Sequence, residues 1–561
     1  MYARWMLGLV MAATCVTQTT FAADVPAPKK LGSVEGFTEY QFANGLRLVT
    51  FVEPSKPKLT VNMTILVGSR HEGYGEAGMA HLLEHMLFKP TAKHPQPDRD
   101  LQERGANYND TTWVDRTNYY ETLPASDDNL EFAIAWEADR LVNCPIKAED
   151  LASEMTVVRN EFEMGENSPK NVLEQRMFAT AFEWHNYGKS TIGNRADIER
   201  VPADSLRVFY KKYYRPDNVV LFVSGRIEEE KAVALTQKYF GPIPRPTEPI
   251  RSTYTEEPAQ DGERQVTLRR VGKVPVASVL YHVPAASDPD FAAVSVLEAI
   301  LSADKTGRLY KALVERQRAS KVEGVAYAWH DPSGMIFNAE VADGNEPSAI
   351  VEGMLDTIET VVEKGVTEEE VTRAKRTLLK LWDQQSTDTP KFTVGLTEWA
   401  GAGDWRLAFL FRDRLNKVSL ADVNRVAKKY LRTSNRTVGV YIPTTEPQRT
   451  PVAPAPDVAE LVKDYRGRPE FSIGEVFDSS PTAIEARVTR SNVTGVKVAT
   501  LTKKNRGGSV VVRLRLRYGS AKSLFGLSTA CAFLPDLMAR GTKKMTAEQL
   551  QDRLDELKTT M

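Results

Sequence analysis

Two histidines and a glutamate share one face of a short segment that the sequence predicts to be helical. His81 and His85 are one helical turn apart, and at about 100° per residue Glu84 falls in the same arc of roughly 100°, opposite Leu82 and Leu83. Two neutral imidazoles in this arrangement can bind one zinc ion. The carboxylate beside them can take a proton from a water molecule that the ion activates. A match this short also arises by chance, and histidines at this spacing also occur on solvated helix faces.

A third ligand is expected, because a catalytic zinc ion usually has three protein ligands and one position for water. The predicted helix at residues 148–165 carries Glu154 and Glu161, about 20° apart around the helix axis. Val157 and Val158 lie between them, so the carboxylates share a partly apolar face, where burial is costly without a positive charge opposite. This pattern favours a zinc ligand on the helix. The alternative is an acidic helix face in contact with solvent.

The chain resembles the insulinase/pitrilysin family of zinc peptidases, whose motif His-x-x-Glu-His is called the inverzincin pattern. The motif at residues 81–85 and a glutamate 76 residues after its second histidine match that family. The resemblance includes residues 68–70, 107–124 and 213–218, and it extends from about residue 32 to the last residue.

This resemblance implies one zinc ion per chain, bound by His81, His85 and Glu161. Glu84 is then the base that accepts a proton from the activated water and returns it to the departing amine. Glu154 matches an acidic residue that supports a ligating histidine in the family.

The substrate implied by the resemblance is an extended peptide or an unfolded polypeptide. Residues 107–112 match the family's edge strand, which pairs with the substrate backbone. Asn109 matches an asparagine of that strand and is expected to contact the substrate.

The sequence contains internal repeats. Residues 44–48 reappear as residues 494–498, and residues 68–93 align without a gap with residues 519–544. In the later copy the three motif residues are replaced by Ala532, Pro535 and Asp536. A middle stretch, residues 253–442, has the same succession of strands and long helices and lacks the motif. Within the later copy, residues 513–517 alternate Arg and Leu, which predicts a strand with one basic face.

These observations, with the resemblance, predict an α+β fold of repeated homologous domains, each a mixed, mainly antiparallel sheet packed against helices. Half of a clamshell and part of a third domain are expected. The predicted segments are a signal peptide (1–22), a zinc-bearing catalytic domain (32–246), a second domain without the motif (247–442), a proline-rich linker (443–480) and an incomplete third domain without the motif (481–561).

Composition and the N-terminus restrict the location and the partners. The 561 residues carry a formal net charge of −1, which gives no electrostatic basis for binding nucleic acid. Arg4, the apolar run at residues 5–16 and Thr20-Phe21-Ala22 have the pattern of an export signal. The run is too short to span a membrane comfortably. We expect export, in a bacterium to the periplasm.

The function expected from these features is that of a zinc metalloendopeptidase. One alternative is a non-catalytic or partner-dependent subunit of the same fold that processes or binds peptides. The family's fourth domain has no counterpart in the sequence, so either a partner chain or a missing C-terminal half is expected to complete the clamshell.

Overall fold

The computed structural model describes residues 26–467 and 473–561, and the predicted signal peptide lies outside the described residues. The chain divides into two units, Met1–Arg449 and Thr450–Met561. Among the described helices, none combines the length and the apolar character needed to cross a lipid bilayer.

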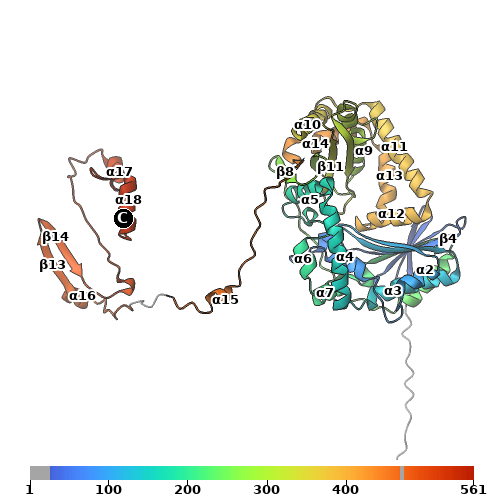
Figure 1. Ribbon diagram of the computed structural model, residues 1–561, viewed down its shortest axis with the longest axis horizontal. Coiled ribbons are helices and arrows are strands. Elements are labelled where there is room, and N and C mark those ends of the chain that lie inside the picture. The colour runs from blue at the N-terminus through green and yellow to red at the C-terminus, as the bar shows by residue number, and fades with distance from the viewer. Residues whose placement is uncertain (1–25, 468–472) are drawn as a thin grey trace, which may run out of the picture. The chain divides into compact units, whose positions relative to one another are not determined.

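A seven-stranded sheet forms the first repeat of the unit Met1–Arg449 (Figure 1). Its strands are β1 (Lys29–Val34), β2 (Phe37–Gln41), β3 (Arg47–Val52), β4 (Lys58–Ile65), β5 (Asn107–Thr112), β6 (Thr117–Pro124) and β7 (Val219–Gly225). They lie in the order β1-β2-β3-β7-β4-β6-β5, with β3 parallel to β7 and the other neighbours antiparallel. Strand β5, which contains residues 107–112, therefore forms one edge of the sheet, as the sequence predicts.

A five-stranded sheet forms the second repeat. Its strands are β8 (Arg264–Arg270), β9 (Val276–Val283), β10 (Ala319–Ala326), β11 (Ser333–Val341) and β12 (Arg436–Pro443). In the order β8-β12-β9-β11-β10 they follow the same path as β3-β7-β4-β6-β5, and again the first two are parallel. The predicted fold of repeated, mainly antiparallel sheets packed against helices is confirmed. The domain boundaries taken from the sequence stay predictions.

The two repeats exchange helices. The first repeat contains α1 (Met79–Met86), α2 (Pro97–Glu103), α3 (Asp127–Asn143), α4 (Ala148–Glu166), α5 (Pro169–Ala181), α6 (Arg195–Arg200), α7 (Ala203–Tyr213) and α8 (Glu229–Tyr239). The second contains α9 (Phe291–Ser302), α10 (Pro347–Lys364), α11 (Glu368–Ser386), α12 (Thr389–Gly401), α13 (Leu407–Lys417) and α14 (Leu420–Tyr430). Helix α5 packs on β8, β9 and β12 of the second sheet, whereas α12 packs on β4, β6 and β7 of the first. Figure 1 shows α12 lying along the first sheet.

Both faces of the central strand β4 are buried as a result. Along β4 the apolar side chains alternate with polar ones, so the two kinds lie on opposite faces. The apolar ones join the core with α3, and they are Leu59, Val61, Met63 and Ile65. The polar ones are buried as well, and they are Thr60, Asn62 and Thr64. A polar strand face that the sequence alone would assign to solvent is covered by α12.

The unit Thr450–Met561 has no buried residue among those described. It contains α15 (Val458–Val462), α16 (Pro481–Arg487), the hairpin of β13 (Val488–Val493) and β14 (Val496–Leu501), α17 (Ser528–Met538) and α18 (Ala547–Glu556). The strand predicted at residues 513–517 is wrong, because these residues have no regular secondary structure. The corresponding strand of the first repeat, β4, is paired on both sides, and the described residues of this unit offer no such partners.

A partly buried ion-pair network joins the two repeats. Arg70 Nε donates to Asp115 Oδ1 at 2.6 Å, and Arg70 Nη1 lies 3.2 Å from Oδ2 of Asp331, which follows β10. Burial raises the pKa of Asp331, but hydrogen bonds with His185 and His330 and the charge of Arg70 outweigh it, so this pKa lies well below its usual range.

Leu396 tests how much the α12 contact stabilises the unit. It is 1% exposed and packs with Phe37, Val220 and Phe222 of the first sheet. Because Leu396→Ala removes buried methyl groups and leaves a cavity, we expect the free energy of unfolding to fall by about 2–5 kcal/mol in urea titrations. The matched control is Leu381→Ala, since Leu381 is 49% exposed and should change stability by less than about 0.5 kcal/mol. Equal effects of the two substitutions would contradict this packing.

Asp331 predicts an acid-sensitive contribution to stability. Because its folded-state pKa is depressed, the ionised carboxylate stabilises the fold above its unfolded pKa of about 3.9, and this stabilisation is lost as pH falls through the folded value. We expect Asp331→Asn to lower the free energy of unfolding above about pH 5, with a difference from the unmodified chain that shrinks below about pH 4. Denaturant titrations of both proteins above about pH 5 and below about pH 4 measure this difference in the free energy of unfolding. The exposed Asp343→Asn is the control, and a pH-independent difference for Asp331→Asn speaks against the ion pair.

Candidate metal centre

Helix α1 carries the motif at residues 81–85, and its N-terminus is tightly packed against neighbouring backbone. Gly78 precedes the helix with φ of +95°, and a Cβ there would lie 2.7 Å from the carbonyl oxygen of Ile192, so a side chain does not fit. The carboxylate of Glu72 accepts hydrogen bonds of 2.9 Å from the backbone N–H groups of Gly78 and Ala80. It thereby satisfies donors at the helix N-terminus that have no partner within the helix. Burial raises the pKa of Glu72 to about 8, although these two hydrogen bonds lower it.

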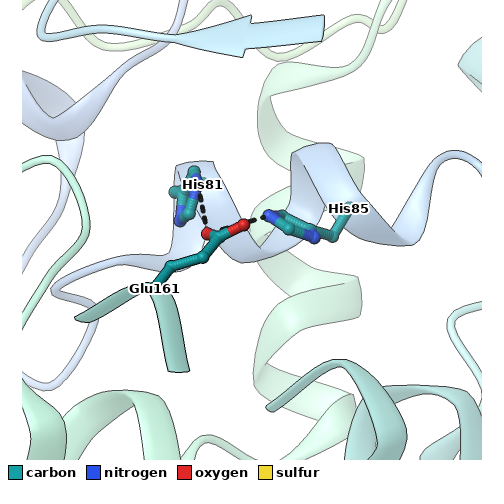
Figure 2. Close-up of side chains that lie close together, drawn as sticks. All are labelled: His81, His85 and Glu161. Carbon is teal, nitrogen blue, oxygen red and sulfur yellow. Dashed lines mark ion pairs between the residues drawn. The ribbon is translucent and has the colours of Figure 1, made fainter. Parts of the chain in front are cut away.

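Glu161 on α4 reaches both histidines of α1. Figure 2 shows its carboxylate between the two imidazole rings. Glu161 Oε2 lies 3.6 Å from His81 Nε2 and 3.6 Å from His85 Nε2. The three side chains are half-buried, so the group remains accessible, and one ligand atom from each lies within 4.8 Å of the others. In the described part of the chain, no other group of His, Cys, Asp and Glu side chains meets this condition.

This donor set fits a zinc ion. Zinc prefers tetrahedral coordination by imidazole nitrogen and carboxylate oxygen at about 2.0–2.2 Å, which places ligand atoms roughly 3.3–3.5 Å apart. The observed separations of 3.6 Å are close to that spacing. Burial lowers the pKa of His81 to about 4, which favours the neutral imidazole that a metal requires.

Glu154 fixes the orientation of one histidine. Its Oε2 lies 3.2 Å from His85 Nδ1, on the side of the ring opposite Nε2, and Lys89 forms an ion pair with its other oxygen. A carboxylate at Nδ1 fixes the tautomer that leaves Nε2 free for a metal. Lys89 is absent from the sequence prediction, although its spacing of four residues from His85 would have suggested it. His81 Nδ1 is buried and has no hydrogen-bond partner among the described residues.

Glu84 lies beside the ligands in a buried position. Its side chain is 5% exposed, and its Oε2 has no hydrogen-bond partner in the described structure. Burial raises the pKa of Glu84 to about 8, and the neighbouring Asp110 adds to this, whereas Thr112 and Arg116 lower it. Asp110 and Arg116 are not predicted from the sequence, because neither has a recognisable spacing from the motif.

Asn109 lies on β5, the edge strand that contacts α1. Its side chain is exposed, and the strand pairs on one side with β6. Asn109 forms no hydrogen bond with His81, His85 or Glu161 in the part of the chain that the structure describes, so its expected role does not involve the ligand group.

An aromatic cavity of about 420 Å³ adjoins His81. Its wall includes Trp113 after β5, Phe178 on α5, and Tyr327 and Trp329 after β10. The rings of Tyr327 and Trp329 stack with centroids 4.6 Å apart, and Phe178 contacts both. The volume lies in the range of binding sites for small molecules, about 300–1,000 Å³. Two of these rings come from the second repeat, which sequence spacing does not reveal.

Comparison with known proteins places the chain among peptidases. Residues 47–195 match the family model described as insulinase (peptidase family M16), and residues 200–378 match the model described as the peptidase M16 inactive domain. The zinc protease PqqE of Helicobacter pylori is 28% identical over 450 residues, which cover 77% of this chain and 97% of that protein. The uncharacterized zinc protease YmxG of Bacillus subtilis is 24% identical over 396 residues, covering 70% and 94%.

Solved structures agree. The crystal structure of a protease from Helicobacter pylori matches with a TM-score of 0.69 and 25% identity, covering 74% of this chain and all of that one. The periplasmic protease PqqL from Escherichia coli shares the fold, with a TM-score of 0.62 and 17% identity over 95% of this chain and 63% of that one. The repeated sheets, the motif on α1 and both family models agree: this chain belongs to the insulinase family of peptidases, family M16.

Proposed function

We propose that the protein is a zinc-dependent endopeptidase that hydrolyses peptides or unfolded polypeptides with water as the nucleophile. The observation that carries this proposal is the convergence of His81, His85 and Glu161 from two helices, beside the buried Glu84. Membership of a peptidase family, with relatives named zinc proteases, supports it.

His81 and His85 would bind zinc through Nε2 and Glu161 through a carboxylate oxygen, one ion per chain. Zinc, when bound, acts as a Lewis acid that lowers the pKa of water and polarises a peptide carbonyl. Glu84 takes a proton from the attacking water and delivers it to the departing amine, since its Oε2 makes no other hydrogen bond among the described residues. Glu154 holds the His85 ring in place through Nδ1.

The substrate would lie along β5 as an added strand. The free edge of this strand offers backbone hydrogen bonds that depend little on the substrate's side chains, with Asn109 exposed on it. The aromatic cavity beside His81 would receive a side chain of the substrate. Such a site takes extended chains and excludes folded proteins.

The alternative is a non-catalytic peptide-binding or processing subunit. Its support is the match of residues 200–378 to a model described as inactive. That match lies outside residues 47–195, which contain the ligand group and Glu84, so endopeptidase activity is the better proposal. We further propose export to the periplasm, for which the pattern at residues 1–22 remains the argument.

Glu84→Gln should abolish hydrolysis and keep one zinc ion per chain, because the amide cannot accept the proton and is not a ligand. We expect kcat for a fluorogenic peptide to fall by at least about 10²-fold. Elemental analysis measures the metal content of the same sample. Near-normal turnover in this variant would remove Glu84 from the role of base, and in the unmodified chain cleavage that persists after chelation would refute the zinc mechanism.

Glu154→Gln should weaken zinc binding without removing a ligand. Loss of the carboxylate at His85 Nδ1 lowers the basicity of the ring, so we expect the dissociation constant for zinc to rise about 10–100-fold in a competition titration with a chromogenic chelator. Glu163→Gln on the exposed side of α4 is the matched control and should leave it unchanged. An unchanged affinity in Glu154→Gln would contradict this assignment.

A further inference from the structure

The hairpin of β5 and β6 is attached to the second repeat at its turn. Residues 113–116 form this turn, which is closed by a hydrogen bond of 2.9 Å from Trp113 N to Arg116 O. Two neighbouring side chains of the turn, Asp115 and Arg116, are buried, and each contacts residues of the second repeat.

Arg116 connects β5 with α12. Its Nη1 donates to the carbonyl oxygen and to Oγ1 of Thr111, both at 2.6 Å, and its Nη2 forms an ion pair with Glu398. The Arg116 side chain is 7% exposed and that of Glu398 is 44% exposed. The guanidinium therefore spans from the backbone of the edge strand to a carboxylate 282 residues later in the chain.

The surroundings fix Arg116 in this position. Asn118 on β6 donates to Thr397 Oγ1 at 3.1 Å, which holds the hairpin against α12. A Cβ on Gly401 would lie 2.9 Å from Cγ of Arg116, so the C-terminal end of α12 packs too closely on the arginine side chain to admit a larger residue there. On the other side of the turn, Asp115 accepts a hydrogen bond of 2.9 Å from the backbone N–H of His330.

We propose that Glu398, acting through Arg116, is a positioning residue for the edge strand β5. The metal-free second repeat thus sets the place and the rigidity of the strand along which the substrate lies. The link between α12 and β5 is a feature of the structure, whereas its consequence for catalysis rests on the proposed function.

The energetics favour this role over that of an incidental surface pair. Ion pairs between exposed side chains contribute little, about 0–1 kcal/mol. Arg116 is buried, and removal of its carboxylate partner leaves a guanidinium charge poorly compensated in a confined space. The arginine then loses the partner that orients it toward Thr111, so β5 loses order at its C-terminal end.

The test compares Glu398→Ala with Glu398→Gln, which keeps a neutral hydrogen-bond acceptor, and with the control Glu352→Ala on the exposed face of α10. In the full-length chain, hydrogen exchange followed by mass spectrometry should show faster exchange at residues 107–112 in Glu398→Ala, by about tenfold, since a hydrogen bond to a charged group is lost. Exchange at β1, the other edge of the same sheet, should not change. Gly401→Ala displaces the arginine stem and should have the same effect as Glu398→Ala.

Binding and catalysis supply a second measurement. In the Glu84→Gln background, Glu398→Ala should raise the dissociation constant of fluorescein-labelled casein about tenfold, with Glu398→Gln in between and zinc content unchanged. With Glu84 intact, KM should rise by a similar factor while kcat changes less than about twofold, since an interaction present in both ground and transition states is lost.

The outcomes separate the two ideas. Equal exchange at residues 107–112 in Glu398→Ala and Glu352→Ala overturns the positioning role, whatever the activity. If exchange is faster in Glu398→Ala but the unmodified chain cleaves no peptide, the link between α12 and β5 is supported and the endopeptidase proposal is rejected. Loss of zinc from Glu398→Ala together with faster exchange at β5 would also overturn the inference, because it would indicate general unfolding.

Discussion

The contact between α1 and α4 is the constraint on which the site depends. It brings Glu161 within 3.6 Å of both histidines, although 76 residues separate it from the second one. The approach requires a glycine at the start of α1, where the backbone of Ile192 leaves no room for a Cβ, and a buried carboxylate, Glu72, that accepts the N–H groups of the helix start. Two carboxylates on α4 then face imidazole rings, Glu154 in a mostly buried position and Glu161 in a partly exposed one.

The second repeat contributes to the first without supplying a ligand. Helix α12 covers the polar face of the first sheet, and α5 packs on the second sheet in return. Buried threonine and asparagine side chains form hydrogen bonds across the first interface, as between Asn118 and Thr397. Each sheet thus lacks a complete cover of its own. The second repeat therefore has a structural role in the first, although its described residues include no comparable group of metal-ligating side chains.

The unit Thr450–Met561 has some elements of the repeat and no core among its described residues. Its hairpin of β13 and β14 and its helix α17 resemble the start of the first repeat, yet no described residue of the unit is buried. A central strand is stabilised by neighbours on both sides. Residues 513–517 have the right alternation and no such neighbours within the described unit, so they form no strand. Alternation alone is therefore not sufficient for this strand.

The sequence by itself predicted the candidate ligands on α1 and much of the architecture. The spacing of His81, Glu84 and His85 fixes one helical face, and the repeats predict similar sheets, because both patterns are local or periodic. The spacing of Glu161 did not exclude the alternative that it lies on a solvent-exposed helix face. Only the packing of α4 on α1 brings its carboxylate to the imidazoles. Only the tertiary structure brings Asp110, Arg116, Glu398 and the rings of the aromatic cavity to the site. They act across strands and repeats, and the distance between side chains far apart in the chain depends on how sheets and helices pack.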